Sequence, residues 1–326
     1  MRVVICGGGV IGASIAYFLA RRGVDVVVVE RMGVACAASG KSGGFLALDW
    51  CDGTPLAPLA RRSFALHASL AEELHGDWGY RRLATYGGGG APQGPGPRRA
   101  NVHVGWLSDA VVVDRRLGST ETTAQVHPAA FTAAMMAAAQ AQGTELRLRR
   151  VTGVMGGTDA GRVSGVEVDG ETVAADAVVI AMGPWSIMAT RWLPLAGVFG
   201  LKGHSLVFET GTVIPAQALF LECEEANGAM QSPEVFPRAD GTTYVCAISS
   251  ESPLPIDPAD VAPDPGAIER LHAICGQLSP ALARAKVLAG QACFRPVTLD
   301  GLPLMGAVPG ISGAYVATGH SVWGIL

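Results

Sequence analysis

The chain has 326 residues, of which 49% are hydrophobic and 16% are charged, and its formal net charge is -4. A chain of this length accommodates about two domains with a large apolar core, which excludes a disordered or fibrous protein. The slightly acidic balance and the scattering of the arginines along the chain argue against a nucleic-acid partner.

Two uncharged stretches raise the question of a membrane segment, and both are rich in glycine. Residues 3–20 contain the segment GGGVIG, and residues 301–326 contain two prolines and six glycines. Helices that cross a bilayer tolerate few such residues, so we expect neither an integral membrane segment nor a signal peptide. The seven cysteines include no C-x-x-C pair and no metal-ligand spacing, which favours reduced thiols in a cytoplasmic protein without a metal site.

The chain opens with the pattern of a parallel β-α-β unit. A strand is predicted over 2–6, a helix over 13–22 and a Val-rich strand over 24–30, with GGGVIG as the first turn. The glycine spacing fits G-x-G-x-x-G, and Glu30 stands where such units place the acid that binds ribose hydroxyls. These glycines let the positive end of the helix dipole approach a pyrophosphate. The unit predicts one dinucleotide site, because no second such motif follows a strand; the alternative is a purely structural glycine turn.

Further elements follow from hydrophobic periodicity and turn residues. The segment at 87–99 is so rich in glycine and proline that we expect an exposed loop there. The segment ASGKSGG at 38–44 suits either a phosphate-binding or ring-binding segment or a surface turn. Helices are predicted over 54–75, 128–142 and 266–278, and strands over 146–151, 163–168, 177–182, 205–209, 234–237 and 243–248.

Several segments carry motifs in a characteristic order. They are GGGVIG with Glu30, ASGKSGG at 38–44, VHPAAF at 126–131, ADAVVIAMGPW at 175–185, FRPVTLDGLPLMG at 294–306 and ATGHSVWGIL at 317–326. Together they resemble the FAD-dependent D-amino acid oxidase-like family, which includes glycine and sarcosine oxidases. The resemblance implies a mixed α/β (α+β) fold. In it, a glutathione-reductase-type, Rossmann-like FAD-binding domain over 1–83, 127–187 and 290–326 interleaves with an antiparallel substrate domain over 84–126 and 188–289.

The resemblance also implies the activity. Such enzymes oxidise the C–N bond of a small amino acid or amine by hydride transfer to flavin N5, with reoxidation by oxygen or another acceptor. Sarcosine oxidases use a lysine near the flavin to activate oxygen, whereas Thr243–Ala247 contains none. Family members continue with a helix beyond WGIL, so we expect a member shortened at Leu326. The alternatives are an impaired member that acts as a dinucleotide-binding or assembly protein and, more weakly, an NAD-dependent dehydrogenase.

The resemblance assigns roles to individual residues. Arg295 is expected to bind the substrate carboxylate, unless it braces the turn at Asp300. Tyr244 and His320 are further catalytic candidates, although an aromatic residue on a strand is commonly part of the core. Cys293 stands where sarcosine oxidases carry a covalently linked flavin, but the motif that follows it favours a buried thiol without that bond. FAD is expected to contact Gly7, Gly9, Val10, Ile11, Gly12, Glu30, Arg31, Ser39, Ser42, Gly43, Gly44, Val154, Ala181, Gly183, Trp185, Gly319, His320 and Ser321.

Overall fold

The predicted β-α-β unit is present in the computed structural model, which describes residues 1–90, 102–157, 161–225 and 228–326. Strand β1 (Arg2–Cys6), helix α1 (Val10–Ala20) and strand β2 (Asp25–Glu30) follow one another, and the two strands pair in parallel. Both strands are buried over most of their length, which accounts for their continuous valine runs.

These strands belong to a six-stranded sheet with the order β19-β20-β12-β1-β2-β8. All neighbours are parallel except β19 and β20, so the carboxyl ends of the parallel strands meet at one edge. Open sheets of this kind bind ligands at that edge. The added strands are β8 (Glu145–Leu148), β12 (Ala177–Ile180), β19 (Leu304–Ala307) and β20 (Ala314–Thr318).

Two layers cover this sheet. Helices α1 and α4 (Pro128–Gln140) bury one face, where Val3 and Val26 pack in their core. The other face, with Val4 and Val27, packs against a three-stranded meander. The meander consists of β9 (Val151–Met155), β10 (Gly165–Val168) and β11 (Glu171–Ala174). The predicted strand over 146–151 is therefore divided between two sheets.

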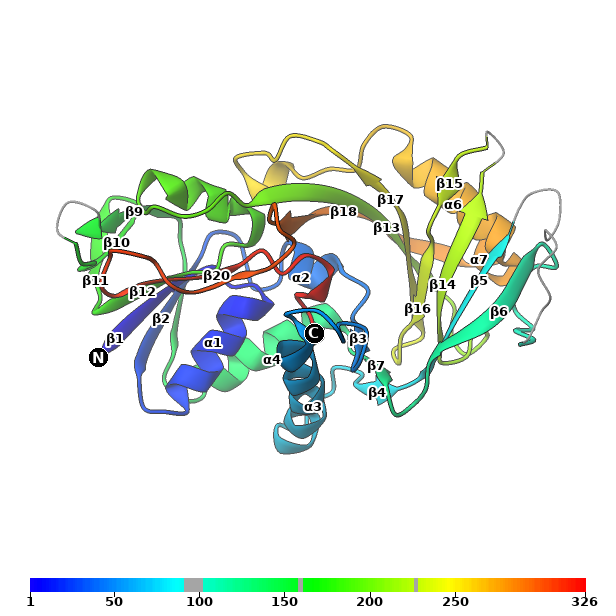
Figure 1. Ribbon diagram of the computed structural model, residues 1–326, viewed down its shortest axis with the longest axis horizontal. Coiled ribbons are helices and arrows are strands. Elements are labelled where there is room, and N and C mark those ends of the chain that lie inside the picture. The colour runs from blue at the N-terminus through cyan, green and yellow to red at the C-terminus, as the bar shows by residue number, and fades with distance from the viewer. Residues whose placement is uncertain (91–101, 158–160, 226–227) are drawn as a thin grey trace.

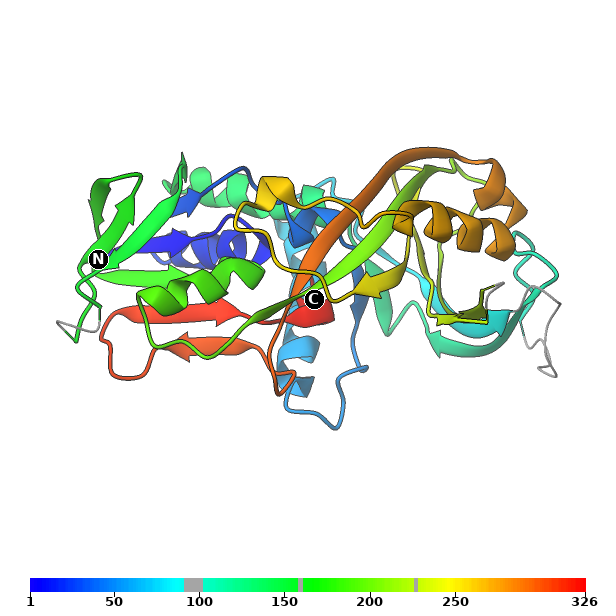
Figure 2. The same ribbon diagram turned by 90° about the horizontal axis from the view of Figure 1, so that it is seen from above.

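A second sheet of eight strands has the order β18-β13-β17-β16-β14-β5-β6, with β15 on β14. Helices α6 (Ala267–Leu278) and α7 (Pro280–Arg284) cover its outer face and bury Leu271 and Leu282. The six-stranded sheet with its covering layers forms the first lobe, and the eight-stranded sheet with α6 and α7 forms the second. Strands β13 and β18 extend from the junction of the two lobes into the second lobe (Figures 1 and 2). The strands are β5 (Ala84–Gly90), β6 (Val111–Gly118), β13 (Phe199–Glu209), β14 (Gln217–Glu224), β15 (Met230–Gln231), β16 (Glu234–Pro237), β17 (Thr242–Ser250) and β18 (Lys286–Val297).

The prediction of an exposed loop from residue 87 onward is wrong for residues 87–90, which form the end of β5 between β14 and β6. The glycines there permit close approach of neighbouring strands. A Cβ on Gly88 would lie 2.1 Å from the carbonyl oxygen of Val112, and one on Gly87 would lie 2.8 Å from Nε of Arg115. Residues 91–99 lie outside the described part of the chain.

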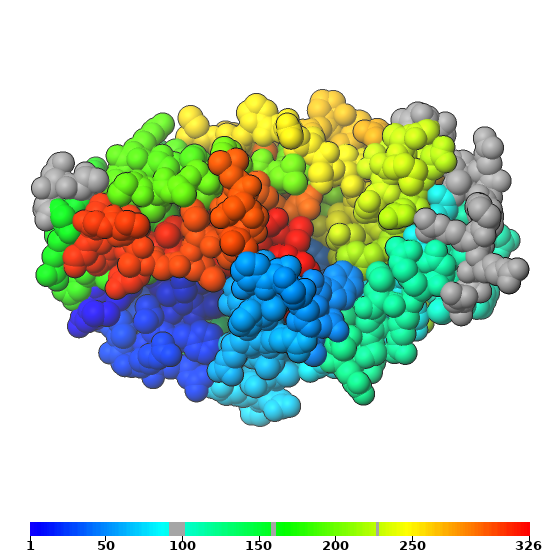
Figure 3. All heavy atoms as spheres, viewed as in Figure 1, coloured from blue at the N-terminus to red at the C-terminus, as the bar shows by residue number. Residues whose placement is uncertain are grey.

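Short elements fill the junction between the lobes. Helices α2 (Ala38–Lys41) and α3 (Ala57–Glu73) and a small sheet of β3 (Phe45–Ala47), β7 (Thr123–Gln125) and β4 (Arg81–Arg82) lie there (Figure 1). The final residues, red in Figure 3, lie at the centre of the molecule in that view. The 3-10 helices are η1 (Gly183–Arg191), η2 (Pro258–Asp260) and η3 (Ser321–Trp323). Within the described ranges, no helix combines the length and the apolar character needed to cross a bilayer.

Candidate functional site

A cavity of about 890 Å³ lies between the carboxyl edge of the six-stranded sheet and the inner face of the eight-stranded sheet. This volume is near the upper end of the ~300–1,000 Å³ range of small-molecule sites. Most of the residues predicted to bind the cofactor or substrate line it. They are Gly7, Gly9, Val10, Ile11, Glu30, Arg31, Ser39, Ser42, Gly43, Gly44, Ala181, Gly183, Trp185, Tyr244, Arg295, His320 and Ser321.

The glycine turn shows why its residues lack side chains. Gly7 has a φ of +115°, and a Cβ on it would lie 2.3 Å from the carbonyl oxygen of Ala181. A Cβ on Gly12 would lie 2.0 Å from the carbonyl oxygen of Gly7. The turn therefore packs tightly enough to bring the start of α1 to the cavity, where the helix dipole favours a negatively charged group.

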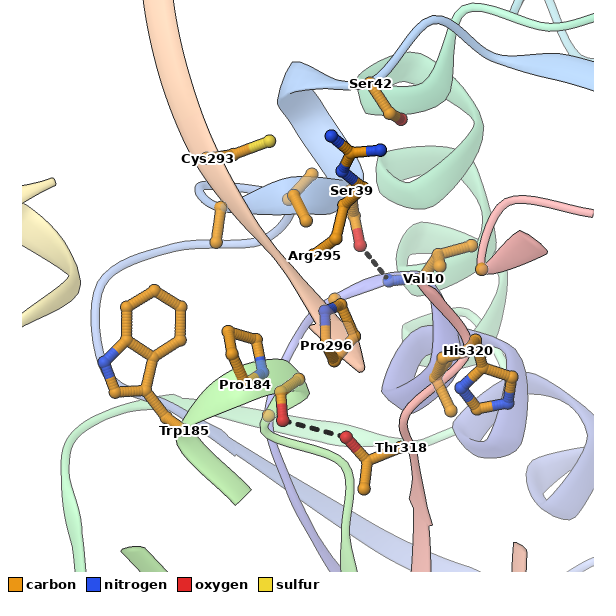
Figure 4. A pocket seen from close by; sticks show the side chains of 18 of the residues that line it. Val10, Ser39, Ser42, Pro184, Trp185, Cys293, Arg295, Pro296, Thr318 and His320 are labelled. Carbon is orange, nitrogen blue, oxygen red and sulfur yellow. Dashed lines mark hydrogen bonds between the residues drawn. The ribbon is translucent and has the colours of Figure 1, made fainter. Parts of the chain in front are cut away.

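Ser39 connects α2 to this turn. Its hydroxyl oxygen accepts a hydrogen bond of 2.9 Å from the Val10 N–H, the first of the helix (Figure 4). No acidic residue occupies the first turn of α1. The hydroxyl proton of Ser39 can therefore be donated to an anion at the helix N-terminus.

Glu30 holds the backbone of the turn. Its Oε2 accepts from the Gly8 N–H at 2.7 Å, and its Oε1 accepts from the Met32 N–H at 2.9 Å. Oε1 also accepts from the Gly33 N–H at 3.5 Å and the Cys36 thiol at 3.9 Å, whereas Oε2 has a single donor. Because each carboxylate oxygen has about two acceptor positions, Oε2 can accept a further hydrogen bond from a hydroxyl group. This geometry fits the ribose-binding role predicted for Glu30.

Residues 255–258, which we call the strap, are bound to the same part of the cavity. The Arg31 guanidinium forms an ion pair with Asp257 and donates to the Ile256 carbonyl at 3.2 Å. The Trp185 indole N–H donates to the Pro255 carbonyl at 2.8 Å. Because Ile256 and Pro258 line the cavity, these contacts hold the strap in place as part of the cavity wall.

The cavity suits FAD in its polar groups as well as its size. Twelve buried side-chain polar atoms among the described residues have no hydrogen-bond partner, and three of them belong to the cavity lining: Ser42 Oγ, Thr152 Oγ1 and His320 Nδ1. All three residues line the cavity, near α2, β9 and η3 respectively. Buried polar atoms are normally paired, so their distribution fits a long ligand with polar groups along its length. Figure 4 shows His320 beside Val10, with Arg295 and Cys293 on one neighbouring strand.

The side chain of Arg295 passes over a glycine of the neighbouring strand to reach the cavity. On β13, Gly203 lies between β18 and β17, and a Cβ on it would lie 3.2 Å from Nη2 of Arg295. The guanidinium donates to the hydroxyl of Ser249 on β17. Among the described residues the Arg295 guanidinium bonds to Ser249 and not to Asp300, whose carboxylate accepts from the Leu302 N–H at 3.0 Å.

The other two predicted catalytic residues also line the cavity. The Tyr244 ring stacks on Phe236 with centroids 6.2 Å apart, and the Arg238 guanidinium lies 5.3 Å from its centroid. Burial raises the pKa of Tyr244 well above its ordinary value, so its hydroxyl stays protonated. Burial lowers the pKa of His320 to about 4, which leaves a neutral imidazole at neutral pH.

Cys293 also lines the cavity, on the same strand as Arg295. Burial raises the pKa of its thiol, against the smaller opposing effects of Arg295 and Lys41. A protonated thiol is a poor nucleophile. This environment favours the buried, unlinked thiol over the covalent alternative.

Three of the residues predicted to contact the cofactor do not line the cavity. Gly12 instead permits the close packing of the turn, and Val154 packs in the core between the meander and the six-stranded sheet. Gly319 has a φ of +80° and turns the chain before His320, with Thr298 at 2.7 Å from where its Cβ would be. Val151 and Thr152 line the cavity in place of Val154.

The sequence predicts a strand over 234–237 but assigns no role to the carboxyl group of Glu234. The structure places Glu234 in the cavity lining, opposite Cys246 of β17. Burial raises the pKa of Glu234 above its ordinary value. The only advance signal is the alternation in β16, which puts Glu234 on the same side of the strand as Phe236.

The parallel sheet, its glycine turn and the cavity at its carboxyl edge together define a dinucleotide-binding fold. The chain matches the sequence profile of the family described as "DAO: FAD dependent oxidoreductase" over residues 2–326. It belongs to this family of FAD-dependent enzymes, and the predicted family, cofactor and mixed α/β fold are confirmed.

Individual relatives and a solved structure are consistent with this family assignment. An oxidoreductase of Schizosaccharomyces pombe is 28% identical over 355 residues, covering 99% of this chain and 90% of that protein. The glycine oxidase of Geobacillus kaustophilus is 28% identical over 360 residues, covering 99% of this chain and 89% of that protein. The crystal structure of glycine oxidase from that organism superposes with a TM-score of 0.82 at 26% identity, covering 99% of this chain and 90% of that one.

Proposed function

We propose that this enzyme oxidises the C–N bond of a small amino acid or of a related amine that carries a carboxylate. The observation that carries the proposal is the Arg295 guanidinium, which lines the same cavity as the glycine turn of the dinucleotide motif. A planar guanidinium binds a carboxylate through two parallel hydrogen bonds. The similarity to glycine oxidases supports the same substrate class.

The two lobes have different roles in this proposal, one in binding FAD and the other in binding the substrate. In this proposal the segments 1–83, 127–187 and 290–326 hold FAD, and 84–126 and 188–289 supply most of the substrate side. The α1 N-terminus and Ser39 bind the pyrophosphate, and Glu30 binds the ribose. The bound FAD supplies the chemistry by accepting a hydride from the substrate.

The substrate-side residues bind and orient. Arg295 fixes the carboxylate and thereby the position of the neighbouring C–H bond, which is what a reaction of this type requires of the protein. Tyr244 forms an aromatic wall beside Phe236. The imidazole of His320 is neutral at neutral pH because burial lowers its pKa, so it can form a hydrogen bond without adding a charge.

The proposal also covers how the reduced flavin is reoxidised and where in the cell the enzyme acts. No lysine is found among the described residues that line the cavity, so the electrons pass to oxygen without that group or to another acceptor. All seven cysteines are free, which supports a reducing, cytoplasmic environment.

A visible-absorption spectrum of the purified chain tests the proposal. We expect flavin bands that bleach when glycine, sarcosine or another small amino acid is added without oxygen. Flavin bands that no amine or amino acid bleaches would support the impaired, dinucleotide-binding alternative. A colourless protein that binds NAD would support the dehydrogenase alternative and contradict the proposal.

A further inference from the structure

Glu234 is a half-buried residue whose carboxyl group lines the cavity and forms no ion pair with any described residue. Its Oε2 accepts only from the Cys246 thiol at 3.5 Å, and no Lys, Arg or His among the described residues forms an ion pair with it. A thiol is a weak donor, and burial raises the pKa of Cys246 well above its ordinary value, so this thiol remains protonated. A buried carboxyl group without a strong hydrogen-bond or ion-pair partner destabilises the folded protein. A ligand with a cationic group could supply that partner.

The inner face of the eight-stranded sheet places this acid opposite Arg295. The strand order is β18-β13-β17-β16, so Arg295 and Glu234 lie on strands that flank β13 and β17. Each side chain contacts β17 from its own side: Arg295 through Ser249 and Glu234 through Cys246. The two charged groups therefore approach the space over β17 from opposite directions.

A bulge in β17 makes this arrangement possible. The register between β13 and β17 shifts between Gly203 and Ser205, which pair with Ser249 and Cys246. Two residues of β17 thus stand opposite one residue of β13, and the alternation of side chains is reversed at that point. As a result both Cys246 and Ser249 line the cavity.

The spacing suits a small amino acid. Cys246 and Ser249 stand opposite Ser205 and Gly203, which are two residues or about 7 Å apart on β13. Glu234 and Arg295 contact Cys246 and Ser249 from the flanking strands. The nitrogen and the carboxylate of an α-amino acid are about 3 Å apart, and a hydrogen bond of about 2.8 Å at each end brings the span to about 9 Å. Ser249 is exposed whereas Glu234 is half-buried, so the carboxylate end would lie nearer the solvent and the amine end deeper.

We propose that Glu234 binds the substrate's amine and accepts the proton that the ammonium group loses before oxidation. This inference rests on the proposed function and adds the amine-binding residue to it. In the step, one N–H bond of the ammonium breaks, its electron pair stays on nitrogen as a lone pair, and an O–H bond forms on the Glu234 carboxylate. The titratable and charged groups that interact with Glu234 are Cys246 and Tyr244 of β17 and Arg295 of β18.

The raised pKa of Glu234 fits this role. A base whose pKa lies above that of an ordinary carboxyl group takes a proton from an ammonium group more readily. Burial is the main cause of that shift, and Arg295 opposes it. The carboxylate would regain a charged partner when the ammonium binds.

The test compares two unreactive ligands of equal size on the FAD-loaded chain. The first, 2-aminoisobutyrate, carries an amine and a carboxylate but no α-hydrogen to be oxidised; the second, 2-hydroxyisobutyrate, lacks the amine. Binding is followed through the visible bands of the flavin. We expect E234Q to weaken binding of the amino ligand about 10-fold or more, the effect of one charge-assisted hydrogen bond, and to change binding of the hydroxy ligand less than about twofold.

The matched control is E209Q, which makes the same change at the exposed end of β13 and should affect neither ligand. The proposal is overturned if E234Q weakens both ligands equally or neither. Folding does not confound the result, because E234Q removes a buried acid and should unfold at the same or a higher temperature than the parent at neutral pH.

A second measurement applies if the methyl groups keep both ligands out of the parent chain. The rate of anaerobic bleaching by sarcosine is measured against pH in the parent and in E234Q. We expect the rising limb of this profile to move to higher pH in E234Q, and an unchanged limb contradicts the role of Glu234. If no amino acid binds to or bleaches the parent chain, the proposed function fails, and the role of Glu234 fails with it.

Discussion

Gly203 lies directly under the guanidinium of Arg295, and a Cβ at this glycine would lie 3.2 Å from Nη2. The missing side chain on β13 lets the arginine of β18 cross one strand and bond to Ser249 on the next. The position of the proposed carboxylate-binding group therefore depends on a residue that contributes no atoms to binding.

The first prediction concerns Arg295. In R295K a point charge replaces the two-pronged donor, so we expect binding of 2-hydroxyisobutyrate and of amino-acid substrates to weaken about 10-fold to 100-fold. Flavin difference spectra measure the affinity. R284K, at an exposed position on α7, is the control and should bind as the parent does. Equal affinity in R295K and the parent would exclude Arg295 as the carboxylate-binding residue.

The second prediction concerns the contact between the lobes at Gly43. A Cβ there would lie 2.2 Å from Cδ2 of Phe236, whose ring is buried against Tyr244. We expect G43A to lower the free energy of unfolding by about 1–3 kcal/mol and to reduce the FAD content. Urea denaturation and the ratio of flavin to protein absorbance measure the two effects.

The control for G43A is G276A in α6, where the nearest atom, Cβ of Ala283, lies 3.8 Å from the new methyl group. Alanine is favoured over glycine in a helix, so this variant should be as stable as the parent or more stable. A G43A protein with normal stability and FAD content would show that the two lobes separate at this contact without cost.

The third prediction concerns Cys293. Because burial raises the pKa of its thiol, we expect no covalent bond to FAD. Precipitation with acid should leave the yellow colour in the supernatant, for the parent and for C293S alike. A yellow pellet from the parent that turns colourless in C293S would contradict this prediction.

The fourth prediction concerns stability in acid. Burial lowers the pKa of both His67 and His320 to about 4, and the His67 ring Nε2 lies 2.8 Å from the carbonyl oxygen of Ile325. Between pH ~6.5 and the folded pKa values, the unfolded chain binds more protons than the folded chain. The free energy of unfolding should therefore fall as the pH falls through this range, by up to about 1.4 kcal/mol per pH unit for each histidine.

Chemical denaturation at several pH values tests the fourth prediction. H67Q and H320Q should each flatten the slope, even where the lost packing lowers the stability at neutral pH. H103Q, at an exposed position, is the control and should keep the parent slope. Parallel curves for all four proteins would show that other groups cause the loss of stability in acid.

The features that the sequence predicts well depend on neighbouring residues. The strand, glycine turn, helix and Glu30 occur within one short segment, so their spacing alone indicates the dinucleotide motif. The end of β5 could not be predicted in this way. Four successive glycines indicate a loop by composition, and only the pairing with β14 and β6 makes them a buried strand.

The role of Glu234 was beyond prediction for a similar reason. Alternation in β16 shows which side of the strand the carboxyl group occupies, but not what it faces. That depends on the bulge in β17 and on the pairing of four strands drawn from distant parts of the chain. The parallel pairing of β14 with β5 within an otherwise antiparallel sheet is a long-range feature of the same kind.

The order of the strands also bears on how the enzyme acquires its cofactor. In the six-stranded sheet β12 pairs with β20, yet six of the strands of the other sheet are encoded between them. During translation those six strands leave the ribosome before β20 can pair with β12. The carboxyl edge of the six-stranded sheet is therefore completed only after most of the other sheet has been synthesised, and a cofactor that needs this edge can bind only after that point.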